Sequence, residues 1–316
     1  MSRPQIFRFA SEGDWLALRR EDLTSTDMAA WLGVSPYATR LDVWLDKRDP
    51  NGGRAFEASE TMRWGNRLEA AIAFGLAERF GLSVHPLKVY MRHGSVSRMG
   101  SSFDFQIVGA NPAAALSDKD RTTTQRIADL LAANGDGIFE IKNVSFQAKK
   151  AYWDVRPDSL EAPLHVELQV QHQLAVSGAG WAAIGALFEG NDGRLEIRER
   201  HEPTIAKLES AVVDFWKAVS DDTPPEVDFT RDLDALKRLY SRLDDTASLN
   251  DDELIALSLH LDEYDVARSI ERDAKKRKEE AQARILAVAG DRSEFSVGPF
   301  RYKRSTARTT ITKKGE

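Results

Sequence analysis

An apolar run at residues 137–144 carries two charged side chains, Glu140 and Lys142, and it constrains the fold more than any other segment. A short run of this kind, with β-branched and aromatic residues, predicts a buried β-strand. Alternate residues of a strand point to the same face, so we expect Glu140 and Lys142 to project together while Ile141 turns toward the core. The run therefore predicts a sheet in which one strand presents an acid and a lysine side by side.

A second acid, Asp104, lies earlier in the chain between Phe103 and Phe105. Two acids and an ammonium group at strand ends can hold a divalent metal ion and place a water molecule beside a phosphate. Hydrolysis of phosphodiesters by a nuclease is therefore the first hypothesis. Simpler interpretations exist, because Asp104 alone fits a solvent-facing residue of a half-buried strand, and Glu140 with Lys142 fits an exposed ion pair.

Composition narrows the chemistry that this chain can perform. It contains no cysteine, which excludes disulfides, thiolate zinc sites and cysteine-held iron–sulfur clusters. The six histidines show no metal-ligand spacing such as His-Glu-x-x-His. The net charge of −6 argues against a protein that coats DNA indiscriminately, but it is compatible with a nuclease whose contacts lie in one cleft.

Length and hydropathy limit the number of domains and the compartments in which we expect the protein. The 316 residues suit one large domain, or one domain with an appendage. No stretch of 18 residues is apolar throughout, and the amino-terminal segment lacks the apolar core of a signal peptide. We therefore expect a soluble, cytoplasmic protein without membrane contact.

The predicted elements follow the order helices, β-meander, acid–lysine strand, helix and strands. Helices are expected within 14–47 and over 57–80, 163–178 and 203–219, and strands over 82–85, 87–93, 97–100, 103–109, 137–144, 181–188 and 195–200. Gly81 and Gly178 are expected to end two of the helices. This order predicts an α/β or α+β fold with a mixed central sheet flanked by helices.

The sequence divides into three parts. Residues 1–225 are interpreted as the catalytic domain, and the Ala-, Asp- and Thr-rich stretch 110–136 within it as an insertion. The leucine spacing and dense charges of residues 226–290 predict a helical or coiled-coil arm. Residues 291–316 are predicted to form a basic, hairpin-like tail.

Short motifs follow one another over roughly residues 12–220. They are Trp15–Arg19, Leu23–Asp27, Trp31–Tyr37, Leu41–Trp44, Trp64–Glu69, Ser101–Asp104, Phe139–Lys142 and Leu168–Gln173. In this order they resemble the lambda-exonuclease and YqaJ-type viral recombinase family, within the PD-(D/E)xK nuclease superfamily. The resemblance implies a restriction-endonuclease-like core and a magnesium-dependent exonuclease that degrades one strand of linear double-stranded DNA from its 5′ end.

The resemblance also implies a catalytic centre. Asp104 and Glu140 match the family's metal ligands, with the backbone carbonyl of Ile141 joining them. Lys142 matches the lysine that orients the attacking water and steadies the charge that develops on the phosphate. Hard divalent cations prefer oxygen ligands, so Mg²⁺ is the expected cofactor and Mn²⁺ is expected to substitute for it.

Further positions match by the same resemblance. Glu69 matches a helical acid that is linked to the metal centre, where it counts as a ligand, and Gln169 matches the glutamine beside the catalytic lysine. Arg19, Thr26 and Ser102 match the positions that hold the 5′-terminal phosphate. Family members often carry serine where this chain has Thr26, but the hydroxyl group is retained.

The family suggests partners as well. These are double-stranded DNA ends, a single-strand annealing protein and further copies of the chain in a ring, a trimer by resemblance, that supplies single strands for phage-type recombination in a bacterial host. Two other hypotheses stay open. One is a different nuclease of the superfamily, RecB-like or an endonuclease, and the other is a non-enzymatic DNA-binding or assembly protein.

Overall fold

The computed structural model describes residues 3–49, 59–156, 159–241, 248–305 and 309–313. The chain forms two compact units, Met1–Ser241 and Arg242–Glu316. The first unit extends beyond the boundary predicted at residue 225, because helix α9 (Leu233–Leu239) buries Ala235 in the core of that unit. The leucines after residue 225 thus serve two different units instead of one arm.

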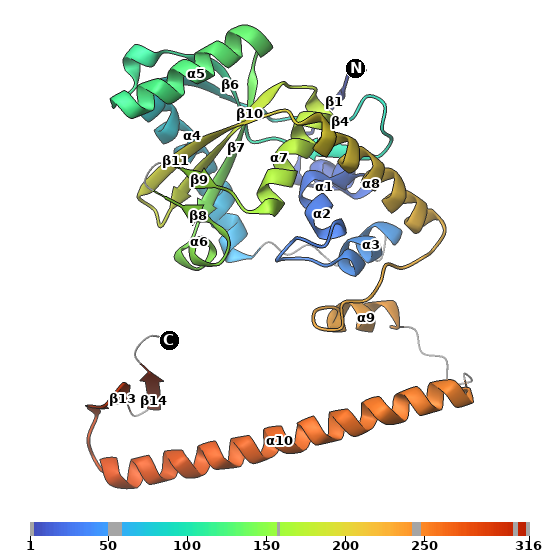
Figure 1. Ribbon diagram of the computed structural model, residues 1–316, viewed down its shortest axis with the longest axis vertical. Helices are drawn as coiled ribbons and strands as arrows, with labels where there is room; N and C mark the ends of the chain where they lie inside the picture. Colours follow the sequence, from blue (N-terminus) through green and yellow to red (C-terminus); the bar gives the residue numbers. More distant parts are fainter. Residues whose placement is uncertain (1–2, 50–58, 157–158, 242–247, 306–308, 314–316) are drawn as a thin grey trace. The chain divides into compact units, whose positions relative to one another are not determined.

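A five-stranded mixed sheet forms the centre of the first unit (Figure 1). Its order is β11 (Asp192–Glu199), β10 (Trp181–Phe188), β7 (Gly137–Val144), β6 (Phe105–Ala110) and β3 (Leu82–Pro86). The central strand β7 runs parallel to β10 and antiparallel to β6. The mixed sheet with flanking helices confirms the predicted fold class.

Helices cover both faces of this sheet. The described helices of the first unit are α1 (Glu12–Glu21), α2 (Ser25–Trp31), α3 (Arg40–Arg48), α4 (Glu60–Phe80), α5 (Asp118–Asn134), α6 (Phe146–Tyr152), α7 (Leu164–Ser177), α8 (Glu202–Ser220) and α9. Those that pack on the sheet include α4 and α5 on one face and α7 on the other. Helices α4 and α7 end at Gly81 and Gly178, with φ of +63° and +76°, as predicted. Glycine suits both positions because other residues are strained at positive φ.

The side chains of β7 alternate between two hydrophobic cores. Ile138 joins a core that includes α7 residues such as Val170, whereas Phe139 and Ile141 join a core that includes α4 residues such as Leu76. This alternation turns every second residue of β7 toward α7 and the others toward α4. The polar site on β7 is therefore expected on the α7 side of the sheet.

A smaller sheet precedes the central one and has the order β1 (Gln5–Phe7), β4 (Tyr90–Arg92), β5 (Met99–Ser102) and β2 (Leu23–Thr24). The predicted strands at 87–93, 97–100 and 103–109 are therefore shifted or shorter in the structure. Asp104 was expected on a strand, but it lies in the bend between β5 and β6. There the chain leaves the small sheet and enters the central one, so the backbone cannot stay extended.

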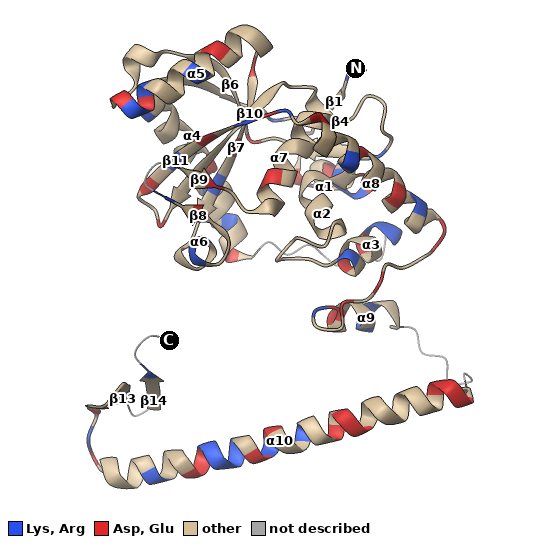
Figure 2. Ribbon diagram, in the orientation of Figure 1, with Lys and Arg blue, Asp and Glu red and all other residues tan. Residues whose placement is uncertain are grey.

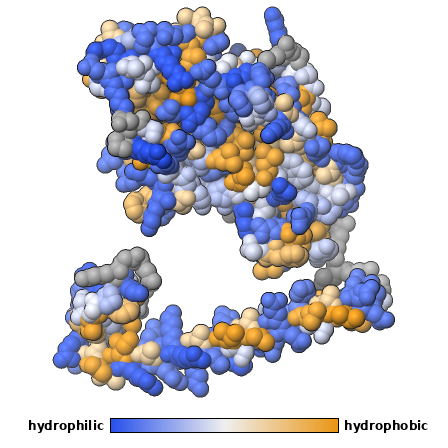
Figure 3. Space-filling model, in the orientation of Figure 1, coloured by the Kyte–Doolittle hydropathy of each residue, from blue (hydrophilic) through white to orange (hydrophobic). Residues whose placement is uncertain are grey.

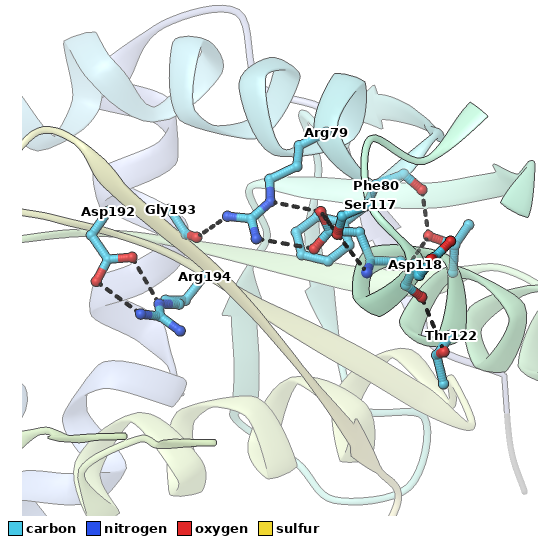
Figure 4. Close-up of polar contacts among 10 residues, drawn as sticks. Arg79, Phe80, Ser117, Asp118, Thr122, Asp192, Gly193 and Arg194 are labelled. Carbon is cyan, nitrogen blue, oxygen red and sulfur yellow. Dashed lines mark hydrogen bonds and ion pairs between the residues drawn. The ribbon is translucent and has the colours of Figure 1, made fainter. Parts of the chain in front are cut away.

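Residues 110–136 pack into the first unit. A 3₁₀ turn (Pro112–Ala114) leads into α5, whose Ile127 and Leu130 are buried in the core beside α4. Arg79 pairs with Asp120 at 3.0 Å and donates to the carbonyl of Gly193 at 2.7 Å, which ties α4 to α5 and β11 (Figure 4). Most of this stretch is therefore helical, and its interpretation as an insertion stays a prediction.

The described residues of the second unit form one long helix and a small sheet. Helix α10 (Asp251–Ala289) is continuous, and its charged residues change from mainly acidic to mainly basic along its length (Figure 2). The tail forms three strands, β12 (Glu294–Val297), β13 (Phe300–Arg304) and β14 (Thr309–Lys313), so the predicted hairpin lacked one strand. In the described parts of the chain, no helix is long and apolar enough to cross a membrane.

Apolar side chains remain exposed along α10. Leu254, Leu257, Leu261 and Tyr264 follow helical spacing and are each more than two-fifths exposed. The exposed apolar residues of this helix are visible as patches in Figure 3. Within the described residues, Ala289 is the one buried position of α10. The helical prediction for this stretch is confirmed, whereas its pairing with another helix stays a prediction.

Candidate functional site

Strand β7 brings Glu140 and Lys142 together on the side that faces α7. The Lys142 ammonium donates to Oε1 of Glu140 at 2.5 Å. Glu140 is only 2% exposed, whereas Lys142 is half-buried. Ile141 is buried in the opposite core, which is the alternation that the sequence predicts. An exposed ion pair, the simpler interpretation of Glu140 and Lys142, does not fit this burial.

Two glutamines of α7 complete the surroundings of Glu140. Gln169 donates to Oε1 of Glu140 at 2.6 Å and accepts from the Lys142 ammonium at 3.0 Å. Gln173 lies one turn later and donates to Oε2 of Glu140 at 2.6 Å. Both carboxylate oxygens are thus hydrogen-bonded, as a buried charge requires. Gln173 was not among the predicted site residues, although its spacing of four from Gln169 was a signal for it.

Asp104 contacts the same strand from the bend after β5. Its Oδ2 accepts from the backbone amide of Ile141 at 2.8 Å. Burial raises the pKa of Asp104 well above its ordinary value, and the negative charges of Glu140 and Glu69 raise it further. Lys142 and the Ile141 amide oppose these effects without cancelling them. The carboxyl group is therefore in an environment that a nearby positive charge would stabilise.

Glu69 of α4 is electrostatically linked to this cluster. Burial raises the pKa of Glu69, followed by the charge of Glu140, while Lys142 and Lys88 lower it. In the described part of the chain, however, no three His, Asp or Glu side chains are grouped so that they could hold a metal ion. Asp104 and Glu140 supply carboxylate oxygens that fit a hard cation, and the part of Glu69 as a further ligand stays a prediction.

The charge state of Lys142 follows from the same surroundings. Burial lowers the pKa of Lys142, but the charges of Glu140 and Asp104 and the hydrogen bond to Glu140 outweigh burial, so the pKa is raised. The side chain is therefore an ammonium ion at neutral pH. In this state it can donate hydrogen bonds and stabilise negative charge.

A second polar cluster gathers the residues matched to a terminal phosphate. Arg19 donates to the hydroxyl of Thr26 at 2.9 Å and lies over the ring of Trp15, 4.8 Å from its centroid. The Trp15 indole donates to the hydroxyl of Ser102 at 2.7 Å. Trp15 thus connects Arg19 to Ser102, a role that the sequence did not predict. Lys47 donates to the carbonyl of Arg19 at 2.7 Å and holds that end of α1.

A cavity of about 260 Å³ joins the two clusters, because Thr26 lines it together with Lys142 and Gln169. A larger cavity of about 350 Å³ lies beside Asp22 and Arg92 and is lined by none of the predicted residues. Arg92 donates to Asp22 at 2.6 Å there, so the charges of that cavity are paired with each other. The smaller cavity, in contrast, is lined by three of the predicted site residues, Thr26, Lys142 and Gln169.

Comparison with known proteins places these features in a family. A family model described as the YqaJ-like viral recombinase domain matches residues 14–180, which include every predicted site residue. The uncharacterized protein YqaJ of Bacillus subtilis (strain 168) is 24% identical over 244 residues, which cover 76% of this chain and 67% of that protein.

Two solved structures are also similar. They are LHK-Exo in complex with dAMP, and LHK-Exo described as an alkaline exonuclease from Laribacter hongkongensis. Their sequence identities to this chain are 18% and 17%, and the TM-scores are 0.48 and 0.47. Each comparison covers 72% of this chain and 98% of the other.

Proposed function

The chain belongs to the YqaJ-like viral recombinase family, and from this premise we propose that it is a magnesium-dependent 5′→3′ exonuclease of linear double-stranded DNA. One observation carries the proposal. Glu140 and Lys142 lie side by side on β7, with Asp104 hydrogen-bonded to the same strand. This set of groups suits metal-assisted hydrolysis of a phosphodiester and has no need of a histidine or cysteine.

Asp104, Glu140 and the carbonyl of Ile141 would hold Mg²⁺, or Mn²⁺ in its place. Their oxygen donors fit a hard cation, and the raised pKa of Asp104 reflects a crowding of negative charge that a cation would relieve. When bound, the ion polarises the scissile phosphate and lowers the pKa of the attacking water. Glu69 would add its charge from α4, where it is linked to the same centre.

The ammonium of Lys142 would position the water and stabilise the charge that develops on the phosphate. Gln169 holds that ammonium at 3.0 Å, so the lysine is oriented before substrate arrives. Gln173 is a positioning residue, because it fixes the Glu140 carboxylate through its own hydrogen bond at 2.6 Å. Such preorganisation reduces the cost of arranging charges during the reaction.

The polarity of the reaction would come from the second cluster. The Arg19 guanidinium and the hydroxyls of Thr26 and Ser102 are donors that suit a terminal phosphate. Thr26 of this cluster and Lys142 line the same cavity of about 260 Å³. A 5′ phosphate held there would present the next phosphodiester of the same strand to the metal centre.

The proposal extends to partners by family resemblance. Further copies of the chain would form a ring, a trimer, around the DNA, and a single-strand annealing protein would receive the strand that remains. The products would serve phage-type recombination by strand annealing in the cytoplasm of a bacterial host. Size measurement of the purified chain, and its co-purification with an annealing protein from the same genome, test these two associations.

The test of the activity uses two forms of one DNA. Linear duplex labelled at its 5′ ends and closed-circular duplex are incubated with Mg²⁺, with Mn²⁺ and with a chelator. We expect the linear duplex to release its label as mononucleotide, and to do so only when metal is present. The closed circle should stay intact under all three conditions. Cutting of the circle would favour an endonuclease. No hydrolysis by the wild type, with DNA binding unchanged by Asp104→Ala and Glu140→Ala, would favour the non-enzymatic hypothesis.

A further inference from the structure

The cavity between the two clusters is lined by both polar and aromatic side chains. Thr26, Lys142 and Gln169 contribute polar groups, and Tyr37, Trp153 and His165 contribute the rings that we call its aromatic wall. Burial lowers the pKa of His165, and the charge of Lys142 lowers it further, so the imidazole is neutral at neutral pH. The aromatic wall is therefore uncharged, whereas the Lys142 ammonium in the same cavity suits a phosphate.

Tyr37 and His165 of this wall come from separate elements, and Tyr152, which is not among the residues that line the cavity, contacts His165. The ring of Tyr37, from the loop before α3, meets His165 of α7 edge-on, with centroids 5.7 Å apart and planes at 88°. Tyr152, at the end of α6, meets the same imidazole at 6.1 Å and 89°. The rings support one another without the aid of a substrate, so the wall is preformed.

Tyr37 is the unusual member of the group. It is 75% exposed although it is a large aromatic residue that lines a cavity. Its loop is nevertheless held, because the Ser35 hydroxyl accepts from the backbone amides of Tyr37 and Ala38 at 3.1 Å and 3.3 Å. Arg231 of the segment before α9 donates to the Ser35 carbonyl at 3.0 Å. An aromatic ring on an anchored loop, with a face open to solvent, is available for stacking.

The positions of the phosphates determine what would lie against this ring. If the proposed function holds, one phosphate lies at Thr26 and the next lies at Lys142, and both residues line the same cavity. The sugar and base between those phosphates must then enter the cavity. Thr26 and Lys142 would hold the phosphates, so the aromatic wall is the part of the lining that offers a surface to the base.

We propose that the ring of Tyr37, supported edge-on by His165, forms a shelf on which the base of the 5′-terminal nucleotide stacks once it has left the duplex. The inference rests on the proposed function and adds a site to it. Every base has a π-face, so stacking accepts all four bases and suits a nuclease that must advance through any sequence. The shelf would hold the nucleotide in register while its 3′ phosphate is hydrolysed.

The test compares two linear duplexes that carry a 5′ phosphate and differ in the terminal nucleotide, which is either intact or abasic. The enzymes are the full-length wild type, Tyr37→Ala, Tyr37→Phe and Tyr240→Ala. Tyr240 is a matched control because it is 70% exposed and lies in the same unit without lining the cavity. Release of the first nucleotide is measured at several DNA concentrations to separate kcat from KM.

We expect the abasic end to lower kcat/KM of the wild type roughly tenfold. Tyr37→Ala should lose a similar factor on the intact end, mainly through KM, and should lose no more on the abasic end. Tyr37→Phe and Tyr240→Ala should behave as the wild type does. His165→Ala is a second variant, and it should show the same insensitivity to the missing base.

Two results would overturn the shelf. In the first, Tyr37→Ala and His165→Ala lose as much kcat/KM on the abasic end, relative to the intact end, as the wild type does. In the second, the wild type releases the first nucleotide equally fast from the intact and the abasic end. The rate at which the wild type releases the first nucleotide from the intact end distinguishes this failure from a failure of the proposed function. If the wild type releases the intact nucleotide, only the shelf is wrong; if it releases none, the exonuclease proposal is wrong and the shelf is rejected with it.

Discussion

Glu140 is a carboxylate in a place where a charge is costly, since it is 2% exposed between a sheet and a helix. Three donors compensate for this burial, the ammonium of Lys142 and the amides of Gln169 and Gln173. Removing one partner of such a group leaves a buried polar atom unpaired, which costs about 1–3 kcal/mol. The donors therefore hold the carboxylate in one orientation, and a site made in this way is rigid before substrate binds.

Lys142→Ala should abolish turnover on linear duplex, with a loss of at least about 100-fold in kcat, because the variant lacks the cation beside the reacting phosphate. DNA binding, measured by fluorescence anisotropy in the presence of Ca²⁺, should change little. Lys150→Ala is the control, since Lys150 is an exposed lysine on the neighbouring helix α6. An equal loss of binding and turnover in Lys142→Ala would refute a chemical role for this lysine.

Arg19→Ala should reduce the preference for ends that carry a 5′ phosphate over ends that carry a hydroxyl. The reason is that Arg19 is the guanidinium beside Thr26, and charge-assisted hydrogen bonds to phosphate are among the strong ones. The measurement is the ratio of initial rates on the two kinds of end. Arg20→Ala removes the adjacent, exposed arginine and should leave the ratio unchanged. An unaltered ratio in Arg19→Ala would remove this assignment.

His172 should make the first unit less stable in acid. It is fully buried, and burial lowers its pKa from 6.5 to about 4, while the Gly100 carbonyl and Asp27 act in the opposite direction and His93 in the same one. Below pH 6.5 the unfolded chain binds a proton that the folded chain does not. The free energy of unfolding is therefore highest, as far as His172 is concerned, above pH 6.5. It falls by up to about 3 kcal/mol as the pH decreases toward 4.

Urea unfolding of the wild type and of His172→Gln at pH 7.5 and pH 4.5 measures this effect. The glutamine can keep a hydrogen bond to the Gly100 carbonyl, which His172 contacts at 3.1 Å, but it does not titrate. We expect the variant to lose less stability than the wild type between the two pH values. Equal losses would mean that the protonation of His172 does not limit acid stability.

At the scale of elements, β7 depends on a close approach at its first residue. A methyl group on Gly137 would lie 2.4 Å from ring carbons of Trp181, which is buried and donates to the Gly135 carbonyl at 2.9 Å. The indole cannot move away without losing that bond. The strand that carries Glu140 and Lys142 therefore begins where only glycine fits beside β10.

Gly137→Ala should destabilise the first unit by about 1–3 kcal/mol because it overpacks this contact. Gly75→Ala provides the comparison, since a methyl group there meets nothing within 4 Å and Gly75 lies inside α4. The second variant should be neutral or more stable by up to about 1 kcal/mol, because alanine favours helix. The measurement is the midpoint temperature of thermal unfolding of the two variants. Similar midpoint temperatures for Gly137→Ala and Gly75→Ala would contradict the expected clash.

At the scale of the molecule, the long helix and the small sheet form a unit distinct from the one that contains the site. The described basic side chains of that sheet include Arg301, Lys303 and Arg304, although Arg301 is paired with Glu294 at 2.5 Å. Among the residues that the structure describes, Leu239 is the last that joins a core cluster of the first unit. The tail can therefore be altered without removing any side chain from those cores.

Deleting residues 295–316 should flatten the salt dependence of DNA binding if the basic tail neutralises phosphates. For every phosphate that the tail neutralises, its deletion should lower the slope of log K against log salt by about 0.9, because fewer counterions are released. Binding is measured between low and moderate salt with the full chain and the deletion. Thr312→Ala keeps every charge of the sheet and serves as the control. A tail that only caps the arm predicts the same slope for all three proteins.

Much of the local structure was predictable from the sequence, because it depends on neighbours along the chain. The period of apolar residues and the glycines at 81 and 178 predicted α4 and α7 with their ends. The apolar run predicted β7 and the common face of Glu140 and Lys142. The order of the motifs predicted the family. It did not give the distances between the side chains of the site.

Contacts between distant residues could be decided only by the tertiary structure. Trp15 and Ser102 lie 87 residues apart in the chain, and Glu140 and Gln173 lie 33 apart, so no local pattern reports that they meet. The bend at Asp104 likewise arises where the chain passes between two sheets. A hydrophobic period tells which face of an element is buried, but the packing of whole elements determines which polar groups then share one cavity.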